Sequence, residues 1–170
     1  MAQESYLQFL EKEKGNIEIN DLVVENEKKV GTDIQESFSF ILKDGLEKIN
    51  GRIYFQPLLF EGLEENPFKA ENRTLPIYFD FPKENVTMVN IKIPEGYAVE
   101  SVPESLIISF GEEGDGSYKF LVTQNGQYLR VESHLQWNHL AFNPEAYANI
   151  RDFYSKIIEK NSEAIVLKQL

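Results

Sequence analysis

The sequence predicts a mainly β fold, an antiparallel and jelly-roll-like β-sandwich of roughly eight strands with a short N-terminal helix and a C-terminal amphipathic helix. Between residues 17 and 137, short runs of alternating polar and apolar residues recur without a helical segment between them. Residues 143–160 then change to a helical period. Because strands and helices do not alternate along the chain, a parallel α/β sheet is disfavoured.

The C-terminal helix is predicted over residues 143–160. Asn143 is a suitable N-cap, Pro144 a suitable first helical residue, and Glu145 suits the positive end of the helix dipole. The apolar side chains fall on one stripe, which must be buried, and we expect it to pack on a sheet; this stripe contains Tyr147, Ile150, Phe153, Tyr154, Ile157 and Ile158. Residues 164–168 either continue the helix or form a short terminal strand.

The N-terminal helix is predicted over residues 3–14, where Tyr6, Phe9 and Leu10 have helical spacing and Gly15 acts as a stop. The alternating runs between the helices predict strands at residues 17–26, 34–43, 52–60, 74–81, 86–93, 106–110, 117–124 and 127–137.

A proline and an Asn-Gly pair indicate where two of these features lie in the fold. Pro57 interrupts the strand at 52–60, which suits an edge position or a bulge. The Asn125-Gly126 pair predicts a hairpin with a type I′ turn, because both central residues of that turn need positive φ. One face of the second hairpin strand is expected to face a core, with Leu129, Val131, Leu135 and Trp137; the opposite face is expected to meet water, with Arg130, Glu132, His134 and Gln136.

The composition excludes several classes of function. The 170 residues carry a net charge of -11, which disfavours nucleic acid as a partner and also disfavours anionic membranes. The chain contains no cysteine, so disulfides, thiolate nucleophiles and Cys-ligated metals are excluded. No apolar run approaches the ~18 residues of a membrane span, so membrane insertion is not expected. The first 14 residues are too polar for a signal peptide.

No motif identifies a catalytic, metal or cofactor site. His134 and His139 lack a converging carboxylate or third ligand at a fixed spacing, so we interpret them as surface or rim histidines. The GEEGDGS segment at 111–117 lacks the spacing of a calcium loop and is interpreted as a solvated turn. We therefore expect no cofactor, no metal and no catalytic residue in this chain.

Seven aromatic residues leave two interpretations open. They could line a carbohydrate or peptide groove, but core packing is the more frequent use of aromatic side chains in a β-sandwich. The seven are Tyr54, Phe55, Phe68, Tyr78, Phe79, Phe81 and Tyr97.

The order of short motifs over residues 17–168 resembles the C-terminal β domain of transglutaminase-like envelope proteins of Bacteroidetes. Each motif is weak alone, and their order and spacing carry the resemblance. The motifs are IYFQPLL at 53–59, ENPFK at 65–69, RTLPIYF at 73–79, IPEGY at 93–97, VPES at 102–105, FNPEAY at 142–147, Phe153-Tyr154 and IVLK at 165–168.

The resemblance implies a non-catalytic accessory domain of unknown function. In those proteins a papain-like core with a Cys-His-Asp triad lies upstream, and this chain has no cysteine to supply the nucleophile. Residues 1–16 would then be the tail of the upstream region, and residues 17–170 a single β-sandwich domain. The implied partner is the upstream core, the implied compartment is the periplasm or cell envelope, and the oligomeric state stays open.

Two further interpretations stay open beside the accessory domain. One is a stand-alone module that binds envelope glycans or peptides, and the other is a hydrolase with a carboxylate pair that no motif reveals.

The segment at 65–73 is the only candidate site. Asn66 and Pro67 are expected to form a turn that inserts Phe68 into the core, and Lys69 and Arg73 to pair with nearby acidic residues. The alternative is that the same loop is a docking surface for the catalytic core.

Overall fold

The computed structural model describes residues 3–15, 17–111 and 114–170. Contacts group the chain into two compact units, Met1–Gly45 and Leu46–Leu170. The predicted origin of residues 1–16 in an upstream region stays a prediction. The contacts of residues 3–15 group them with the two strands that follow.

In the first unit, helix α1 (Gln3–Lys14) packs on a hairpin of β1 (Ile17–Glu25) and β2 (Gln35–Leu42). Leu10 of the helix is buried, as are three residues of β1, which are Ile17, Ile19 and Leu22. The Glu11 carboxylate also accepts the backbone N–H of Ile19 at 2.9 Å. The helix therefore covers one face of the hairpin and one backbone group of β1.

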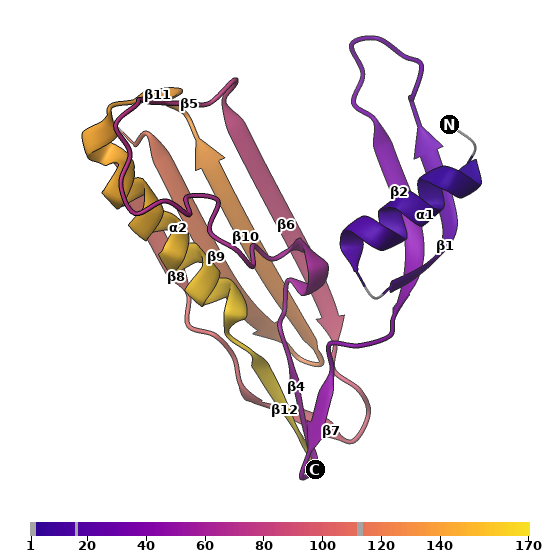
Figure 1. Cartoon of the computed structure of the whole chain (residues 1–170). Coiled ribbons are helices and arrows are strands. Elements are labelled where there is room, and N and C mark those ends of the chain that lie inside the picture. The colour runs from indigo at the N-terminus through magenta and orange to yellow at the C-terminus, as the bar shows by residue number, and fades with distance from the viewer. Residues whose placement is uncertain (1–2, 16, 112–113) are drawn as a thin grey trace. The chain divides into compact units, whose positions relative to one another are not determined.

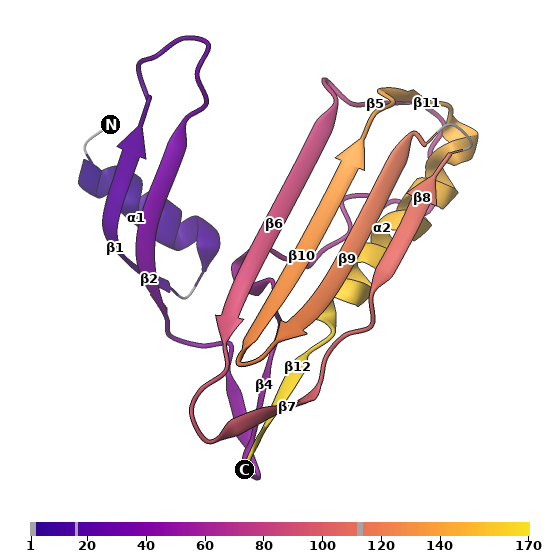
Figure 2. The same cartoon turned by 180° about the vertical axis from the view of Figure 1, so that it is seen from behind.

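The second unit contains two four-stranded antiparallel sheets (Figures 1 and 2). The first, called here the main sheet, has the order β6-β10-β9-β8, with strands Lys83–Lys92, Tyr128–Trp137, Gly116–Asn125 and Leu106–Phe110. The second has the order β3-β4-β12-β7, with strands Glu47–Ile49, Arg52–Phe55, Ile165–Gln169 and Tyr97–Ser101. A two-stranded pair joins β5 (Ile77–Tyr78) to β11 (Ala141–Phe142).

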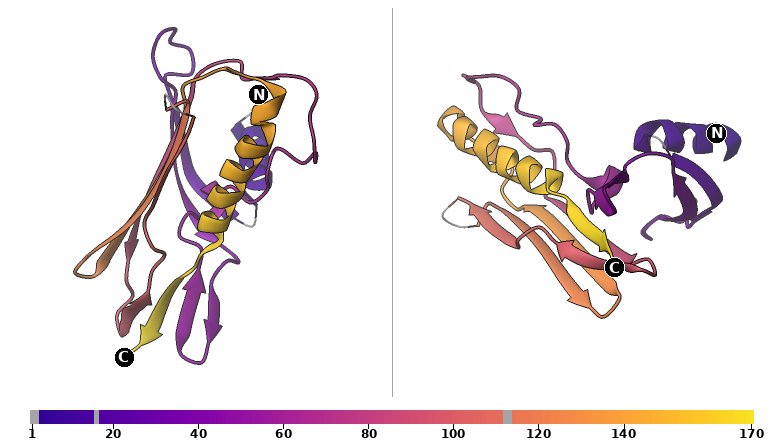
Figure 3. Two further views of the ribbon diagram at one scale, coloured as in Figure 1. Left: turned by 90° about the vertical axis from the view of Figure 1, so that its left-hand side faces the viewer. Right: turned by 90° about the horizontal axis from the view of Figure 1, so that it is seen from below.

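Helix α2 (Tyr147–Ser162) lies across one face of the main sheet and leads into β12 (Figure 3). Its stripe of apolar residues forms one core cluster with the inner residues of β9, β10, β4 and β12. The layer opposite the main sheet is therefore part helix and part sheet. The mainly β antiparallel fold with a helix at each end is confirmed.

Aromatic packing fixes where the main sheet meets the helix. The Trp137 ring stacks on Tyr154 at a centroid distance of 5.9 Å, and its Nε1–H donates to the Tyr154 hydroxyl at 3.0 Å. Gly116 lies beside Trp137 on the neighbouring strand, and a Cβ placed there would lie 2.8 Å from the indole ring. Glycine is therefore the residue that leaves room for Trp137.

Several predicted elements differ in extent from the structure. The strand predicted at 52–60 ends at Phe55, and its residues after Pro57 form a turn and a short 3-10 helix, η1 (Leu59–Glu61), that bury Leu58. Its edge position is wrong, because β4 lies between β3 and β12. The strand predicted at 74–81 is reduced to β5. Strands β3 and β7 were not predicted, and residues 165–169 form the terminal strand rather than more helix.

The hairpin between β9 and β10 is confirmed, but its turn is not the predicted one. Asn125 pairs with Tyr128, so Gly126 and Gln127 are the central residues. Only Gly126 has positive φ, at 59°, which is the pattern of a type II′ turn.

The start of the C-terminal helix also differs. Pro144–Ala146 form a 3-10 turn, η2, before α2 begins, and Asn143 is extended without a side-chain capping bond. The helix is present as predicted, but the Asn143 side chain does not cap it.

Candidate functional site

The loop predicted from the sequence lies on helix α2. The Asn66 side-chain amide donates to the Arg151 carbonyl oxygen at 2.9 Å and to the Ser155 hydroxyl at 3.0 Å. Its carbonyl oxygen accepts the backbone N–H of Phe68 at 2.9 Å, which closes an Asx-type turn around Pro67. A single asparagine therefore fixes both the shape of the turn and its position on the helix.

Phe68 lies against two tyrosines of the same helix. Its ring meets Tyr154 at a centroid distance of 5.2 Å and Tyr147 at 5.8 Å, the latter edge to face. The Tyr147 hydroxyl donates to the Ala70 carbonyl oxygen at 2.8 Å, which holds the loop two residues further on. Phe68 thus packs against the core cluster, as the sequence predicts.

The two basic residues of the loop behave differently from each other. Lys69 pairs with Glu65 at 2.6 Å and lowers the pKa of that carboxyl, and both side chains are exposed. Arg73 donates to the carbonyl oxygens of Leu75 and Pro76, at 3.0 and 3.4 Å. Lys69 therefore has the predicted acidic partner, whereas Arg73 braces the backbone that leads into β5.

The braced segment presents three large apolar side chains to solvent. Leu75, Tyr78 and Phe81 have exposed fractions of 69%, 72% and 65%, and we call them the apolar triplet. Of the residues between them, Ile77 is buried and Phe79 packs on Trp137 at a ring-centroid distance of 5.3 Å, whereas Asp80 is exposed. The backbone of this segment is held by Arg73 before β5 and by the pairing of β5 with β11.

The triplet was not predicted, because nothing local in the sequence separates Tyr78 and Phe81 from the five other aromatic residues. The structure divides that group, with Tyr54 half-buried, Tyr78 and Phe81 exposed, and the other four against the core, which are Phe55, Phe68, Phe79 and Tyr97. Strand alternation gives no signal for the triplet, because Phe81 has the same parity as Ile77 and Phe79, which pack inward.

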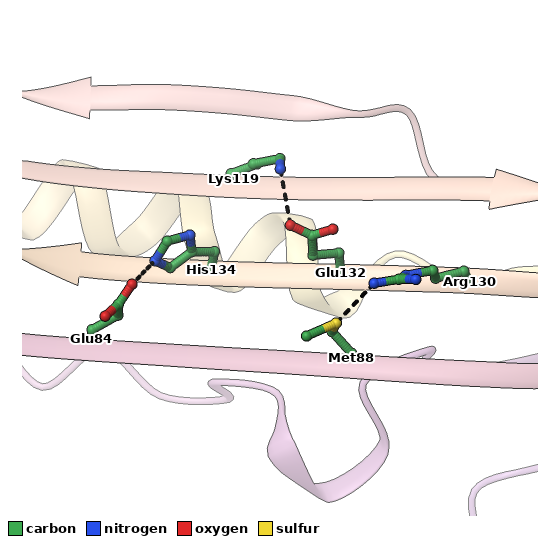
Figure 4. Close-up of polar contacts among 6 residues, drawn as sticks. All are labelled: Glu84, Met88, Lys119, Arg130, Glu132 and His134. Atoms are coloured by element: carbon green, nitrogen blue, oxygen red, sulfur yellow. Dashed lines mark hydrogen bonds and ion pairs between the residues drawn. The ribbon is translucent and has the colours of Figure 1, made fainter.

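The outer face of the main sheet carries cross-strand polar contacts (Figure 4). His134 meets Glu84 at 2.8 Å, and Lys119 meets Glu132 at 2.9 Å. Lys119 holds the pKa of the Glu132 carboxyl below its usual value. This face also exposes apolar side chains, among them Val86, Met88, Ile107 and Tyr128. Its charges are of both signs, so it does not have the single-sign field of a nucleic-acid surface.

The described residues contain no group of three or more His, Cys, Asp or Glu side chains that could hold a metal ion. His139 Nδ1 lies 3.9 Å from Asp115 Oδ1 at the exposed end of the main sheet, and His134 Nε2 contacts the Glu84 carboxylate. In the predicted GEEGDGS turn, residues 112–113 lie outside the described residues. The geometry does not assign either histidine a catalytic role.

A buried polar contact lies beside a small hollow next to α2. The Tyr118 hydroxyl donates to the Asn161 side-chain oxygen at 2.6 Å, and burial raises the pKa of Tyr118 to about 12. Asn161 also borders a hollow of about 210 Å³ lined by the 56–64 loop and the last turns of the helix. Its walls carry no histidine and no basic residue, so the hollow has no acid–base pair.

The comparisons with known proteins agree with this picture of a β domain. The sequence matches a family described as a domain of unknown function with a solved structure, DUF3858, over residues 51–167. This chain belongs to the DUF3858 family. No curated protein matches the sequence.

The DUF3858 domain also has a structural relative. A crystal structure of a protein from Parabacteroides distasonis, described as a putative protease, matches with a TM-score of 0.55 and 15% sequence identity. The match covers 70% of this chain and 24% of that protein, so the chain spans about a quarter of its relative's length. At this identity the likeness shows a shared fold. Among the residues the structure describes, no helix is both long and apolar enough to cross a bilayer.

Proposed function

We propose that this DUF3858 domain is a non-catalytic accessory domain of a larger transglutaminase-like protein, in which it supports or positions an upstream papain-like core. The apolar triplet is the observation that carries the proposal. Leu75, Tyr78 and Phe81 are three large, exposed apolar residues within seven positions, on a backbone held by Arg73 and by β11. Rigid, exposed apolar groups of this kind are typical of protein docking surfaces.

Three further observations support the proposal. The sequence has no cysteine, so the nucleophile of a Cys-His-Asp triad must come from another part of the protein. The structural relative is a much longer protein that is described as a putative protease. The contacts of Asn66 and Phe68 stabilise the loop on α2, which gives the triplet a fixed base. The parent protein would be exported, with this domain in the periplasm or cell envelope.

The first experiment is the intact mass of the native protein, isolated from its host with an antibody to this domain. The proposal predicts a mass several times the 19.7 kDa of the chain. A mass near 19.7 kDa would refute the accessory role, and screens for glycan and peptide binding would then test the alternative of a stand-alone module.

The second experiment tests the docking role of the triplet in the native protein. Replacing Leu75, Tyr78 and Phe81 together by Ser should make the upstream core more sensitive to limited proteolysis. Tyr128→Ser is the matched control, since Tyr128 is also an exposed aromatic residue but lies on the main sheet. Equal sensitivity of the two variants would contradict docking through the triplet.

The free energy of unfolding of the isolated 170-residue chain distinguishes residues that serve docking from residues that stabilise the fold. Phe81→Ala should change the free energy of unfolding by less than ~0.5 kcal/mol, because the side chain is exposed. Phe68→Ala should cost about 2 kcal/mol, because it removes a half-buried ring from α2. Urea denaturation of both variants measures the difference. An unchanged stability of Phe68→Ala would show that the loop is not structural.

A further inference from the structure

The free edge of β6 has the features of a site for pairing with another strand. Strand β6 pairs with β10 on one side and is the outermost strand of the main sheet in the described part of the chain (Figure 2). It is regular over ten residues and carries no proline. Residues 85–91 are uncharged, and Val86 and Met88 on the outer face are about half exposed. A long, flat, uncharged edge of this kind can recruit another strand.

Most other edges in the structure are short or blocked. The edges of the second sheet are β3, with three residues, and β7, whose pairing with β12 is irregular. Strand β8 has five residues. In the first unit, β1 has a bulge, and Glu11 occupies one of its backbone N–H groups. The long edges are therefore those of β6 and β2.

Charge decides which occupant fits the edge of β6. When two copies of a strand pair antiparallel about a two-fold axis, the numbers of every two opposite residues add up to the same value. Opposite residues lie on the same face of the sheet, and residues of one strand that share a face are all even or all odd, so this sum must be even. Centring the axis on Met88 places Glu84 of each copy opposite Lys92 of the other. This register forms two opposite-charge pairs on the outer face, and the residues between them are uncharged. Strand β2 contains a single charged residue, Glu36, so no register of two copies of β2 can form such opposite-charge pairs.

We propose that β6 pairs with β6 of a second copy, antiparallel and centred on Met88, to form a homodimer with one continuous eight-stranded sheet, four strands from each copy. Met88 would face Met88 of the partner at the axis, and Val86 would face the partner's Asn90. Because the contact is limited to one edge and its flanking side chains, the dimer is smaller than a standard interface and should be weak. This dimer is independent of the docking role of the apolar triplet.

A charge-reversal series tests the register. Sedimentation equilibrium of the 170-residue chain should show dimers that form with increasing concentration, up to about 1 mM. Glu84→Lys places like charges opposite one another at both ends, and Lys92→Glu does the same with the opposite sign. Each single variant should weaken dimerisation about tenfold or more, and the double variant should restore it.

Controls separate this effect from damage to the fold. Glu84→Lys and the double variant both lose the Glu84–His134 contact, so recovery of the double variant relative to Glu84→Lys cannot come from that contact. Met88→Arg should weaken the dimer, whereas Ile107→Arg, on β8 of the same face, should not. A chain that stays monomeric at all concentrations would overturn the proposal. So would a double variant that fails to recover, since a partner other than a second copy would not follow this register.

Discussion

The two faces of the main sheet are made by the same strands but depend on different interactions. On the inner face of β9 and β10, the largest side chains are at most 1% exposed, and these are Tyr118, Phe120, Leu129, Val131 and Trp137. On the outer face, the residues that alternate with them form exposed polar contacts, such as the Lys119–Glu132 ion pair and the hydrogen bond between His134 and Glu84.

The difference teaches where the stability of the domain lies. A buried aromatic side chain contributes several kcal/mol, whereas an exposed ion pair contributes ~0–1 kcal/mol. The inner face therefore holds the fold, and the outer face can change its side chains at little cost. A partner that pairs along the edge of β6 would contact outer-face side chains that contribute little to folding.

The largest effect is expected for Trp137→Ala on the inner face. Trp137 touches Phe79, Phe110, Phe142, Phe153 and Tyr154, so its removal leaves a cavity lined by rings. We expect a loss of about 3–5 kcal/mol in the free energy of unfolding, measured by urea denaturation.

The control for this variant is Arg130→Ala on the outer face of the same strand. Arg130 is exposed and donates to the Met88 sulfur, so its removal should cost less than ~0.5 kcal/mol. Similar losses for the two variants would mean that the outer face supports the fold as well.

Alternation along the strands was enough to predict this contrast. The two faces of β10 were predicted correctly, because side chains alternate along a strand. The burial itself alternates only over Tyr128–Val131, and residues 132–136 are all half-buried. Tight turns were harder to predict. Asn50-Gly51 forms a turn with positive φ at both residues, as a type I′ turn requires, but no hairpin was predicted there because β3 has only three residues. At Asn125-Gly126, the register of the long strands moved the turn by one residue.

The candidate site was predictable in part. The Asn-Pro-Phe turn and the inward Phe68 follow from local chemistry, because an asparagine before Pro-Phe can close an Asx turn. The partner of Arg73 could not be predicted from local sequence, since its two acceptors are backbone carbonyl oxygens. The orientation of Tyr78 depends on the pairing of β5 with β11, more than sixty residues later in the chain.

A smaller effect is expected at alkaline pH from Tyr118 on the inner face. Its pKa is raised to about 12 from an ordinary value of 10.0. Below pH 10 both states of the protein keep the hydroxyl protonated, and the stabilisation is complete. As the pH rises from 10 to 12, the unfolded chain ionises first, so the folded state loses about 2–3 kcal/mol.

Unfolding of the native chain and Tyr118→Phe between pH 9 and 12 measures this loss, with the range set by the raised pKa. The variant lacks the ionisable hydroxyl, so the difference in unfolding free energy between the two proteins should fall over this range. Burial also raises the pKa of Tyr154. Both proteins contain Tyr154, so its effect on the unfolding free energy cancels in the difference between them. A constant difference would mean that Tyr118 is open to water.

The smallest effect is expected at acid pH from Glu132 on the outer face. The hydrogen bond from Lys119 lowers the pKa of the Glu132 carboxyl below its ordinary value of 4.5. The stabilisation is therefore present above pH 4.5 and is lost as the pH falls through the folded value. The melting temperatures of the native chain and Lys119→Met should differ slightly at pH 7 and converge in acid. The difference in melting temperature between Glu132→Gln and Lys119→Met should not shrink in acid, because neither variant has the ion pair. A difference between the native chain and Lys119→Met that survives full protonation would assign the role of Lys119 to packing of its aliphatic stem, and the outer face would then resemble the inner one more closely than its charges indicate.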